Sequence, residues 1–344
     1  MQRFLRIALG VLACACLLKA QQPQKVKISY PSNAGAAWPL YLAKEGGYFA
    51  TNGLDVQLDS VAPTAGISKV SGGEVTMAST TLGQAMSASS RDGSLIAYAS
   101  PLRKSPLALM ANKDIKSVRD LKGKSIGVLQ VGDETYQFAV AILAKNGMTP
   151  ADVQWLIADE QNNGCIGALA NGRVDATMVD APESSELEKQ GFRSLSNIAD
   201  FEDISAPTVI LFRKMTVASH PHLPEQFIRA NAEAIRRFYG DKAFAVKAYL
   251  KYYNGDESAV SKMYDRYVTS NAFERIPYIP SAAVQYARSH PADVETAARF
   301  KQFDFRMVLD NSIVTRLVRT AFFDKLFGKG IRVEEDRKSK LAFK

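Results

Sequence analysis

The sequence predicts an α/β protein that consists of two units of mostly parallel sheet followed by a helical tail. Between residues 25 and 197, short apolar runs that suit strands alternate with helical stretches. This alternation is typical of parallel sheets with right-handed crossovers. It starts again near Leu107, which indicates a second unit, and after Arg213 the strand-like runs stop.

The first unit combines strand-like runs with helical stretches between them. The expected strands are 26–30, 54–61, 75–80 and 95–100, and the expected helices are 38–45, a short one around 67, and 81–91. Gly46 and Gly47 end the first of these helices. Tyr48 and Phe49 follow the two glycines, and we expect their rings to anchor the turn onto the unit rather than to bind a ligand.

The second unit repeats this order. The expected strands are 106–112, 125–131, 152–158, 174–180 and 192–198, with helices near 117–124, 138–145, 165–172 and 184–191. Ser117 is a candidate N-cap, because its hydroxyl can accept a hydrogen bond from the first helical turn. Residues 208–213 form a further strand, and a long helical stretch begins at Leu223. The mixed charges of residues 334–344 predict a solvated end.

The helical tail needs an apolar surface to cover. We expect the chain to leave the first unit near Ile115, build the second unit and return near Ala206, so that two crossing segments act as a hinge. Residues 25–114 and 208–344 would then form one lobe with the tail packed on it, and residues 115–207 would form the other lobe.

The N-terminus has the features of an export signal, which we assign to residues 1–20. Arg3 and Arg6 precede the uncharged apolar run 7–18, which is too short to span a bilayer comfortably. Two cleavage positions remain open, one after Ala20 and one at Cys14, where "VLAC" resembles a lipoprotein box. Both predict a periplasmic or other extracytoplasmic location, and the second adds a lipid anchor on Cys14.

The sequence lacks the motifs of the main catalytic and nucleic-acid-binding classes. It has no phosphate-binding glycine loop, no nucleophile elbow and no dinucleotide fingerprint after the first strand. The net charge is +8, but the basic residues are spread out and form no aromatic–basic stripe. We therefore predict no catalytic residue, no metal, no cofactor and no nucleic-acid partner. Cys165 is expected to be a buried, inert thiol.

Polar residues gather where the expected strands end, which is where open parallel sheets bind ligands. Trp38 and Tyr41, at the start of the first helix, could wall the same crevice. The candidate ligand-binding residues are Ser32, Asn33, Trp38, Tyr41, Ser79, Thr80 and Ser100 in the first unit, and Gly132, Asp133, Glu134, Thr135 and Asp180 in the second.

Each candidate also has a structural interpretation. Ser32 and Asn33 suit a turn, and Thr80 or Thr81 suits the cap of the next helix. Trp38 and Tyr41 suit a core equally well. Asp180 suits the N-cap of the helix that follows it.

Six segments, taken in order, carry a resemblance to a known family: "WPLYLAKEGGYFATNGLDVQL", "GGEVTMAST", "IKSVRDLKGKSIGV", "NGMTPADVQW", "ALANGRVDATMVDAP" and "SHPHLPEQFIRANAEAI". Together they resemble the periplasmic substrate-binding proteins of nitrate, sulfonate, taurine and thiamine-precursor ABC importers. The resemblance implies a two-lobed type II periplasmic-binding-protein architecture that closes on one small molecule. It also implies a permease and an ATPase as partners, and we expect a monomer that touches the membrane only through the permease or a lipid anchor.

The resemblance leaves alternatives open. Some enzymes of thiamine-precursor and menaquinone pathways resemble these binding proteins, and a ligand-sensing partner of a membrane receptor would use the same binding chemistry. One departure concerns the ligand: family members often carry Gly and small hydroxyl residues where this chain has "GDET". If Asp133 or Glu134 faces the cleft, it favours a cationic or neutral nitrogenous ligand over a small anion.

Overall fold

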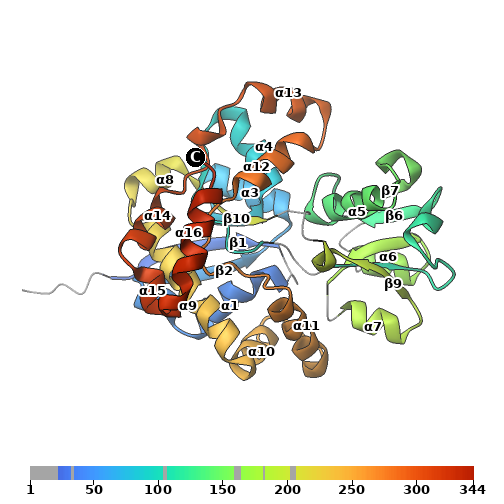
Figure 1. Cartoon of the computed structure of the whole chain (residues 1–344), viewed down its shortest axis with the longest axis horizontal. Coiled ribbons are helices and arrows are strands. Elements are labelled where there is room, and N and C mark those ends of the chain that lie inside the picture. The colour runs from blue at the N-terminus through green and yellow to red at the C-terminus, as the bar shows by residue number, and fades with distance from the viewer. Residues whose placement is uncertain (1–21, 32–34, 104–106, 159–163, 181–182, 202–206) are drawn as a thin grey trace, which may run out of the picture.

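Two sheets, each covered by helices on both faces, form the two lobes of the protein. The computed structural model describes residues 22–31, 35–103, 107–158, 164–180, 183–201 and 207–344. We call the body built on the first sheet, with the helical tail, lobe 1, and the body built on the second sheet lobe 2. Figure 1 shows them side by side. Among the described residues, no helix combines the length and the hydrophobicity needed to cross a bilayer.

The first sheet has the strand order β2-β1-β3-β10-β4. β1 is parallel to β2 and β3, whereas β10 is antiparallel to both of its neighbours. The strands are β1 (Gln24–Tyr30), β2 (Leu54–Ser60), β3 (Met77–Thr81), β4 (Leu95–Ala97) and β10 (Thr208–Arg213). The helices between them are α1 (Trp38–Glu45), α2 (Tyr48–Thr51), α3 (Pro63–Gly72) and α4 (Leu82–Asp92).

The second sheet has the order β7-β6-β8-β5-β9, again with one antiparallel strand, β5, in the described part. The strands are β5 (Ala108–Ala111), β6 (Ser125–Val128), β7 (Gln154–Ile157), β8 (Ala176–Val179) and β9 (Arg193–Asn197), and the helices are α5 (Glu134–Lys145), α6 (Gly164–Ala170) and α7 (Glu183–Lys189). β5 thus belongs to lobe 2, although the sequence analysis had assigned residues up to 114 to lobe 1. The pairing that decides this is long-range and leaves no local signal.

The antiparallel strand of each sheet is the first strand after the chain crosses between the lobes. Near the crossing, Leu102 pairs with Thr208 as an isolated bridge, and the Thr208 N–H donates to the Leu102 carbonyl at 3.1 Å. The described residues that flank the two crossings on the lobe 1 side therefore lie side by side, which is the arrangement expected of a hinge.

The tail of helices packs on lobe 1, as expected. It consists of α8 (Lys214–Ser219), α9 (Leu223–Gly240), α10 (Lys242–Leu250), α11 (Glu257–Thr269), α12 (Ser281–Ser289), α13 (Val294–Gln302), α14 (Ser312–Arg319), α15 (Phe322–Phe327) and α16 (Arg332–Leu341). Most of the end that was predicted to be solvated forms α16, and Arg337, Lys340 and Lys344 are exposed as expected, whereas Glu335 is buried.

Local capping chemistry matches the sequence in several places. Thr81 is the N-cap of α4 and accepts from the Gln84 N–H at 3.3 Å. Ser117 forms a capping box with Asp120. Gly47 adopts a left-handed conformation (φ 72°) just after α1, and Phe49 of α2 is buried against Phe227. Tyr48 and Phe49 are therefore scaffold.

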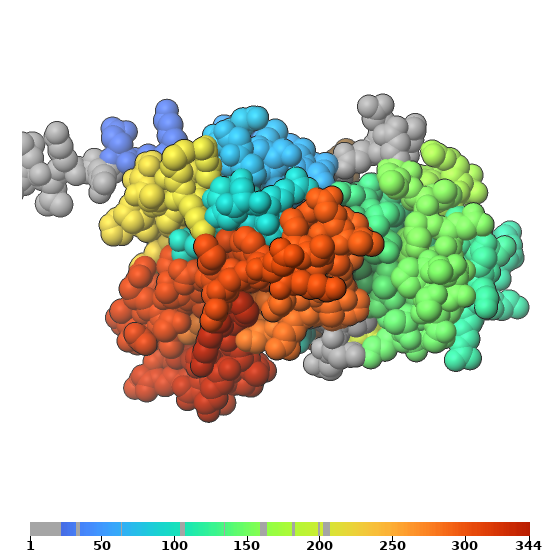
Figure 2. All heavy atoms as spheres, turned by 90° about the horizontal axis from the view of Figure 1, so that it is seen from above, coloured from blue at the N-terminus to red at the C-terminus, as the bar shows by residue number. Residues whose placement is uncertain are grey.

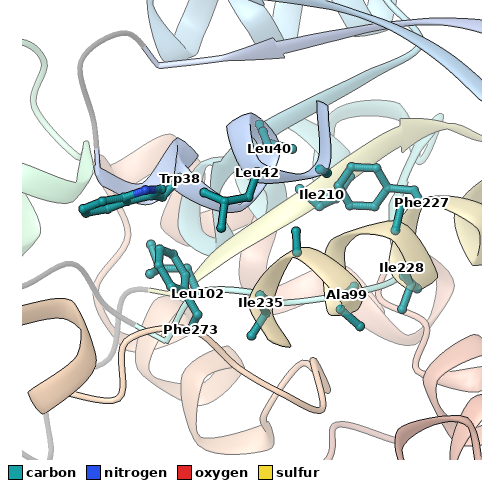
Figure 3. Packing of buried hydrophobic residues seen from close by; sticks show 14 of the residues in the cluster. Trp38, Leu40, Leu42, Ala99, Leu102, Ile210, Phe227, Ile228, Ile235 and Phe273 are labelled. Carbon is teal, nitrogen blue, oxygen red and sulfur yellow. The ribbon is translucent and has the colours of Figure 1, made fainter. Parts of the chain in front are cut away.

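The main core of lobe 1 lies between the first sheet and helices α1, α9, α10 and α11. Figure 3 shows Trp38 and Leu42 of α1 close to Phe273, and Ile210 of β10 facing α9. Trp38 has no exposed surface, and its indole N–H donates to the Ala245 carbonyl at 2.8 Å. Its ring centre lies 4.6 Å from that of Tyr249. Trp38 thus joins α1 to the helical tail.

Trp38→Ala should lower the free energy of unfolding by about 3–5 kcal/mol, because it leaves a large cavity in a packed core. The matched control is Trp155→Ala, since Trp155 is the second of the two tryptophans and is only half-buried. Urea unfolding followed by circular dichroism would measure both. Equal losses in the two variants would contradict the central position assigned to Trp38.

Candidate ligand-binding site

The carboxyl ends of the two sheets face each other, and Asp180 links them. Asp180 directly follows β8 in lobe 2 and is half-buried. Its Oδ2 atom accepts from the Gly35 N–H at 3.3 Å and from the Tyr267 hydroxyl at 2.7 Å. Gly35 follows β1 and Tyr267 lies on α11, so both donors belong to lobe 1.

Gly35 permits this contact because it has no side chain. A Cβ at position 35 would overlap the phenol ring of Tyr267. Tyr267 itself is fully buried and stacks on Phe273, with ring centres 5.3 Å apart. The ring is therefore held by the core of lobe 1 while its hydroxyl reaches lobe 2.

Two more contacts extend the junction along α7. The Tyr253 hydroxyl donates to Glu183 Oε1 at 2.9 Å, and the Arg266 guanidinium donates to the Ser184 hydroxyl at 3.3 Å. Burial raises the pKa of Glu183. In each of these contacts the donor comes from lobe 1 and the acceptor from lobe 2. We call these residues the closing surface: Gly35, Tyr253, Arg266 and Tyr267 of lobe 1, with Asp180, Glu183 and Ser184 of lobe 2.

The lobes also touch on the other side of the junction. A Cβ on Gly132 would lie 2.6 Å from the Cβ of Ala292, which is in lobe 1 between α12 and α13. The φ angle of Gly132 is +88°, a conformation that also favours glycine. Gln137 of α5 donates to the Gly132 carbonyl and lies against Gly83 of α4. The structure thus represents a state in which the lobes are in contact.

Asp133, a predicted ligand contact, is the N-cap of α5. Its carboxylate accepts from the Tyr136 N–H at 2.7 Å and from the Thr135 hydroxyl at 2.7 Å, and it is 6% exposed. Burial raises its pKa, although these hydrogen bonds oppose the change. The hydrogen-bonding groups of Asp133 and Thr135 are therefore paired with each other at the N-terminus of α5. The side chain of Glu134, and the whole of Ser32 and Asn33, lie outside the described residues.

The predicted hydroxyl residues of lobe 1 bond to nearby groups. Ser100 donates to the Thr208 carbonyl at 3.2 Å, and Thr80 donates to Gln84 at 2.9 Å. Ser79 lines a small cavity of about 10 Å³, together with Ala36 and other residues of lobe 1. That volume is about the size of one water molecule. These hydroxyls lie near the junction, but they are buried in this state.

Tyr41, like Trp38, lies in the core rather than in the wall of a crevice. It is 2% exposed, and its ring stacks on Tyr252 with centres 4.2 Å apart. Burial raises its pKa far above the usual value. In this state, neither aromatic residue presents a surface to a ligand. The sequence could not decide between the two roles, because an apolar helix pattern looks the same in a core and in a binding wall.

A second hollow lies elsewhere on lobe 1. It has a volume of about 620 Å³ and borders the edge strand β2, with Lys25, Lys27 and Lys44 among its lining residues. The Lys44 ammonium donates to the Val56 carbonyl, which protects this sheet edge. The hollow lies beside the first residues of β1, away from the strand ends where ligands bind in such sheets. We therefore place the candidate site at the closing surface.

Cys165, which the sequence analysis expected to be buried, lies on α6 and is half-buried. Burial raises the pKa of the Cys165 thiol to about 11, so the protonated form dominates at neutral pH. In the part of the chain that the structure describes, no three His, Cys, Asp or Glu side chains are grouped as metal ligands would be.

The fold agrees with comparisons to known proteins. Residues 36–242 match the model of the family described as "NMT1/THI5 like". The chain belongs to the NMT1/THI5-like family. The alkanesulfonate-binding protein SsuA of Xanthomonas axonopodis pv. citri, solved with MOPS, has the same two-lobed fold. It is 19% identical, with a TM-score of 0.65, over 86% of this chain and 98% of that chain.

Curated relatives match over shorter spans. The riboflavin-binding protein RibY of Chloroflexus aurantiacus is 25% identical over 230 residues, which are 62% of this chain and 62% of that protein. A Brucella abortus protein, provisionally named a binding protein, is 30% identical over 131 residues, or 37% of this chain. The match spans only 40% of the length of that relative.

Several residues of the closing surface were not predicted from the sequence. Tyr253, Arg266 and Tyr267 lie in the helical tail, far along the chain from the strand ends that they meet. Glu183 was assigned only to a helix, and Gly35 only to a turn region. The one early signal was the position of Asp180 at the end of a buried strand.

Tyr267→Phe should shift the protein toward an open state. The change keeps the buried ring but removes the hydroxyl that bonds to Asp180, and a hydrogen bond to a charged group contributes about 1.5–3 kcal/mol. Small-angle X-ray scattering should show an increased radius of gyration.

The matched control is Tyr264→Phe, because the Tyr264 hydroxyl donates to the Phe238 carbonyl within lobe 1 at 2.6 Å. It should lower stability without changing the scattering curve. If both variants scatter like the unmodified protein, the Asp180–Tyr267 contact does not control closure.

Proposed function

We propose that this protein is an extracytoplasmic solute-binding protein that delivers one small molecule to an ABC importer. Membership of the family, the two-lobed fold and the paired crossing segments all support a body that opens and closes. The observation that carries the proposal is the Asp180 carboxylate, which receives donors from two elements of lobe 1 at the facing ends of the sheets. A ligand bound there would lie between the lobes.

The charge of the closing surface favours a cationic or neutral nitrogenous ligand. Lobe 2 contributes two acidic side chains, Asp180 and Glu183, whereas Arg266 is the one cation of the defined set. Carboxylates at a partly desolvated junction attract N–H donors and repel small anions. Our sequence-based reason for this ligand class was Asp133 or Glu134, but the Asp133 carboxylate caps α5 and the Glu134 side chain lies outside the described residues. The proposal therefore now rests on Asp180.

The role of a solute-binding protein also specifies the partners, the exported form and the movement of the lobes. The partners are a permease and an ATPase, and the protein acts as an exported monomer, either released after cleavage at Ala20 or anchored through Cys14. Closure moves lobe 2 as a body about the crossing segments, and the predicted hydroxyl contacts at Ser79 and Thr80 become accessible in the open state. Glu134, Ser32 and Asn33 remain predicted contacts.

We also propose that the protein is a binder rather than an enzyme on this scaffold. A thiol-based mechanism needs a thiolate, and the raised pKa of Cys165 works against one. Of the three histidines, His220 and His222 lie at the ends of α8 and α9, away from the strand ends where catalytic groups of α/β enzymes gather. The exposed ring of His290 is bonded to the Tyr286 carbonyl and the Ser289 hydroxyl.

A thermal-shift screen of amines, pyrimidines, flavins, taurine and nitrate would test the ligand class. A ligand at a hundred times its dissociation constant should stabilise the folded protein by about 2.7 kcal/mol. We expect hits among the amines or nitrogenous rings and none with taurine or nitrate. Tight binding of either anion would overturn the ligand class.

Asp180→Asn should abolish or strongly weaken the shift produced by a hit, because it removes the charge at the junction. The control is Asp114→Asn, since Asp114 is an exposed acid of lobe 2. It should bind like the unmodified protein. An unchanged shift in Asp180→Asn would place the ligand elsewhere.

A further inference from the structure

The positive charge of the protein is concentrated at its C-terminal end. Residues 316–344 contain nine Lys or Arg and four Asp or Glu, whereas residues 21–315 contain 31 of each. Outside the presumed export signal, the whole net charge therefore lies in the last 29 residues. These residues form the end of α14, α15 and α16.

Much of this basic charge is on the surface. Arg316 bonds to Glu225 and Arg332 bonds to Asp324, and in both pairs the guanidinium is exposed while the carboxylate is largely buried. Lys338 turns inward and pairs with Glu274 and Glu334. Six further basic residues are exposed and form no ion pair with another described residue: Arg319, Lys325, Lys329, Arg337, Lys340 and Lys344. We call these six residues the basic end.

The outer face of α16 combines this charge with apolar side chains. Val333, Arg337, Lys340 and Leu341 follow each other at intervals that place them on one side of a helix. Val333 is 79% exposed and Leu341 is 54% exposed. Glu335 lies on the opposite side and is 6% exposed, so α16 is fixed with this face outward.

The opposite end of the molecule has the opposite charge. Residues 108–200, which build lobe 2, contain nine basic and thirteen acidic residues. Figure 2 shows the last residues, in red, on the half of the molecule away from the green atoms of lobe 2, where they project to one side of the long axis, and Figure 1 agrees. The molecule therefore has a charge dipole with a component along its long axis.

We propose that the basic end binds the surface of an anionic lipid bilayer and holds lobe 2 away from it. Basic residues near an anionic bilayer are attracted individually, and exposed apolar side chains on the same helix face can enter the headgroup region. An acidic protein partner would explain the charge, but it gives no role to isolated apolar residues between the basic ones. The proposal does not depend on the ligand-binding function.

Vesicle co-sedimentation tests the proposal. The full chain is mixed with vesicles of equal parts phosphatidylglycerol and phosphatidylcholine, and separately with phosphatidylcholine alone. Phosphatidylcholine vesicles carry no net charge, so binding to them measures any contribution that the apolar run 7–18 makes without electrostatic attraction. We expect excess binding to the anionic vesicles, and we expect high salt to remove most of this excess through screening.

The variant Arg337→Gln, Lys340→Gln, Lys344→Gln removes three charges of the basic end. Each of the three charges should raise the partition coefficient between water and the anionic vesicles by about fivefold. Removing all three should therefore lower the excess binding by about a hundredfold. The control Lys113→Gln, Lys116→Gln, Lys124→Gln removes three exposed charges from lobe 2. It changes the net charge equally and should leave the excess binding nearly unchanged.

Each other outcome overturns the proposal. Equal losses in the two variants mean that net charge, and not the basic end, drives binding. No excess binding of the unmodified chain to anionic vesicles leaves an acidic protein as the occupant of this surface. Circular dichroism should confirm that both variants remain folded, which is expected because all six replaced side chains are exposed.

Discussion

The contact between Asp180 and Tyr267 is the interaction on which the arrangement of the two lobes depends. The carboxylate lies at the end of β8 and the hydroxyl is fixed by the core of lobe 1, so the bond can form only when the carboxyl ends of both sheets meet. Gly35 allows the close approach and adds a second donor. Trp38 serves the site indirectly, because its ring packs against Tyr267 at 5.8 Å and supports the donor from behind.

The crossing segments explain how such a contact can be both made and broken. Each crossing leads directly into the antiparallel strand of a sheet, β5 in lobe 2 and β10 in lobe 1, which lies between two other strands. β5 and β10 therefore anchor the chain on either side of the crossings, and Thr208 is bonded to Leu102 on the lobe 1 side. A hinge of this kind moves the lobes as rigid bodies and leaves their cores intact.

The order of strands and helices, the caps at Thr81 and Ser117 and the end of α1 could be predicted because they follow from neighbouring residues. The closing surface could not, since Asp180 is separated from Gly35 by 145 positions and from Tyr267 by 87. An acidic residue after a strand can cap a helix, as Asp133 does, or bridge two lobes, as Asp180 does. Only the tertiary structure distinguishes these roles, and the same holds for Trp38 and Tyr41.

A double-mutant cycle on Asp180 and Tyr267 tests the central claim most directly. Urea unfolding of Asp180→Asn, Tyr267→Phe and the double variant would give the coupling energy between the two side chains. We predict a favourable coupling of at least about 1 kcal/mol, because both variants remove the same interlobe bond. Losses that add to within about 0.5 kcal/mol would contradict the account, since they would mean that the lobes do not meet through this pair in solution.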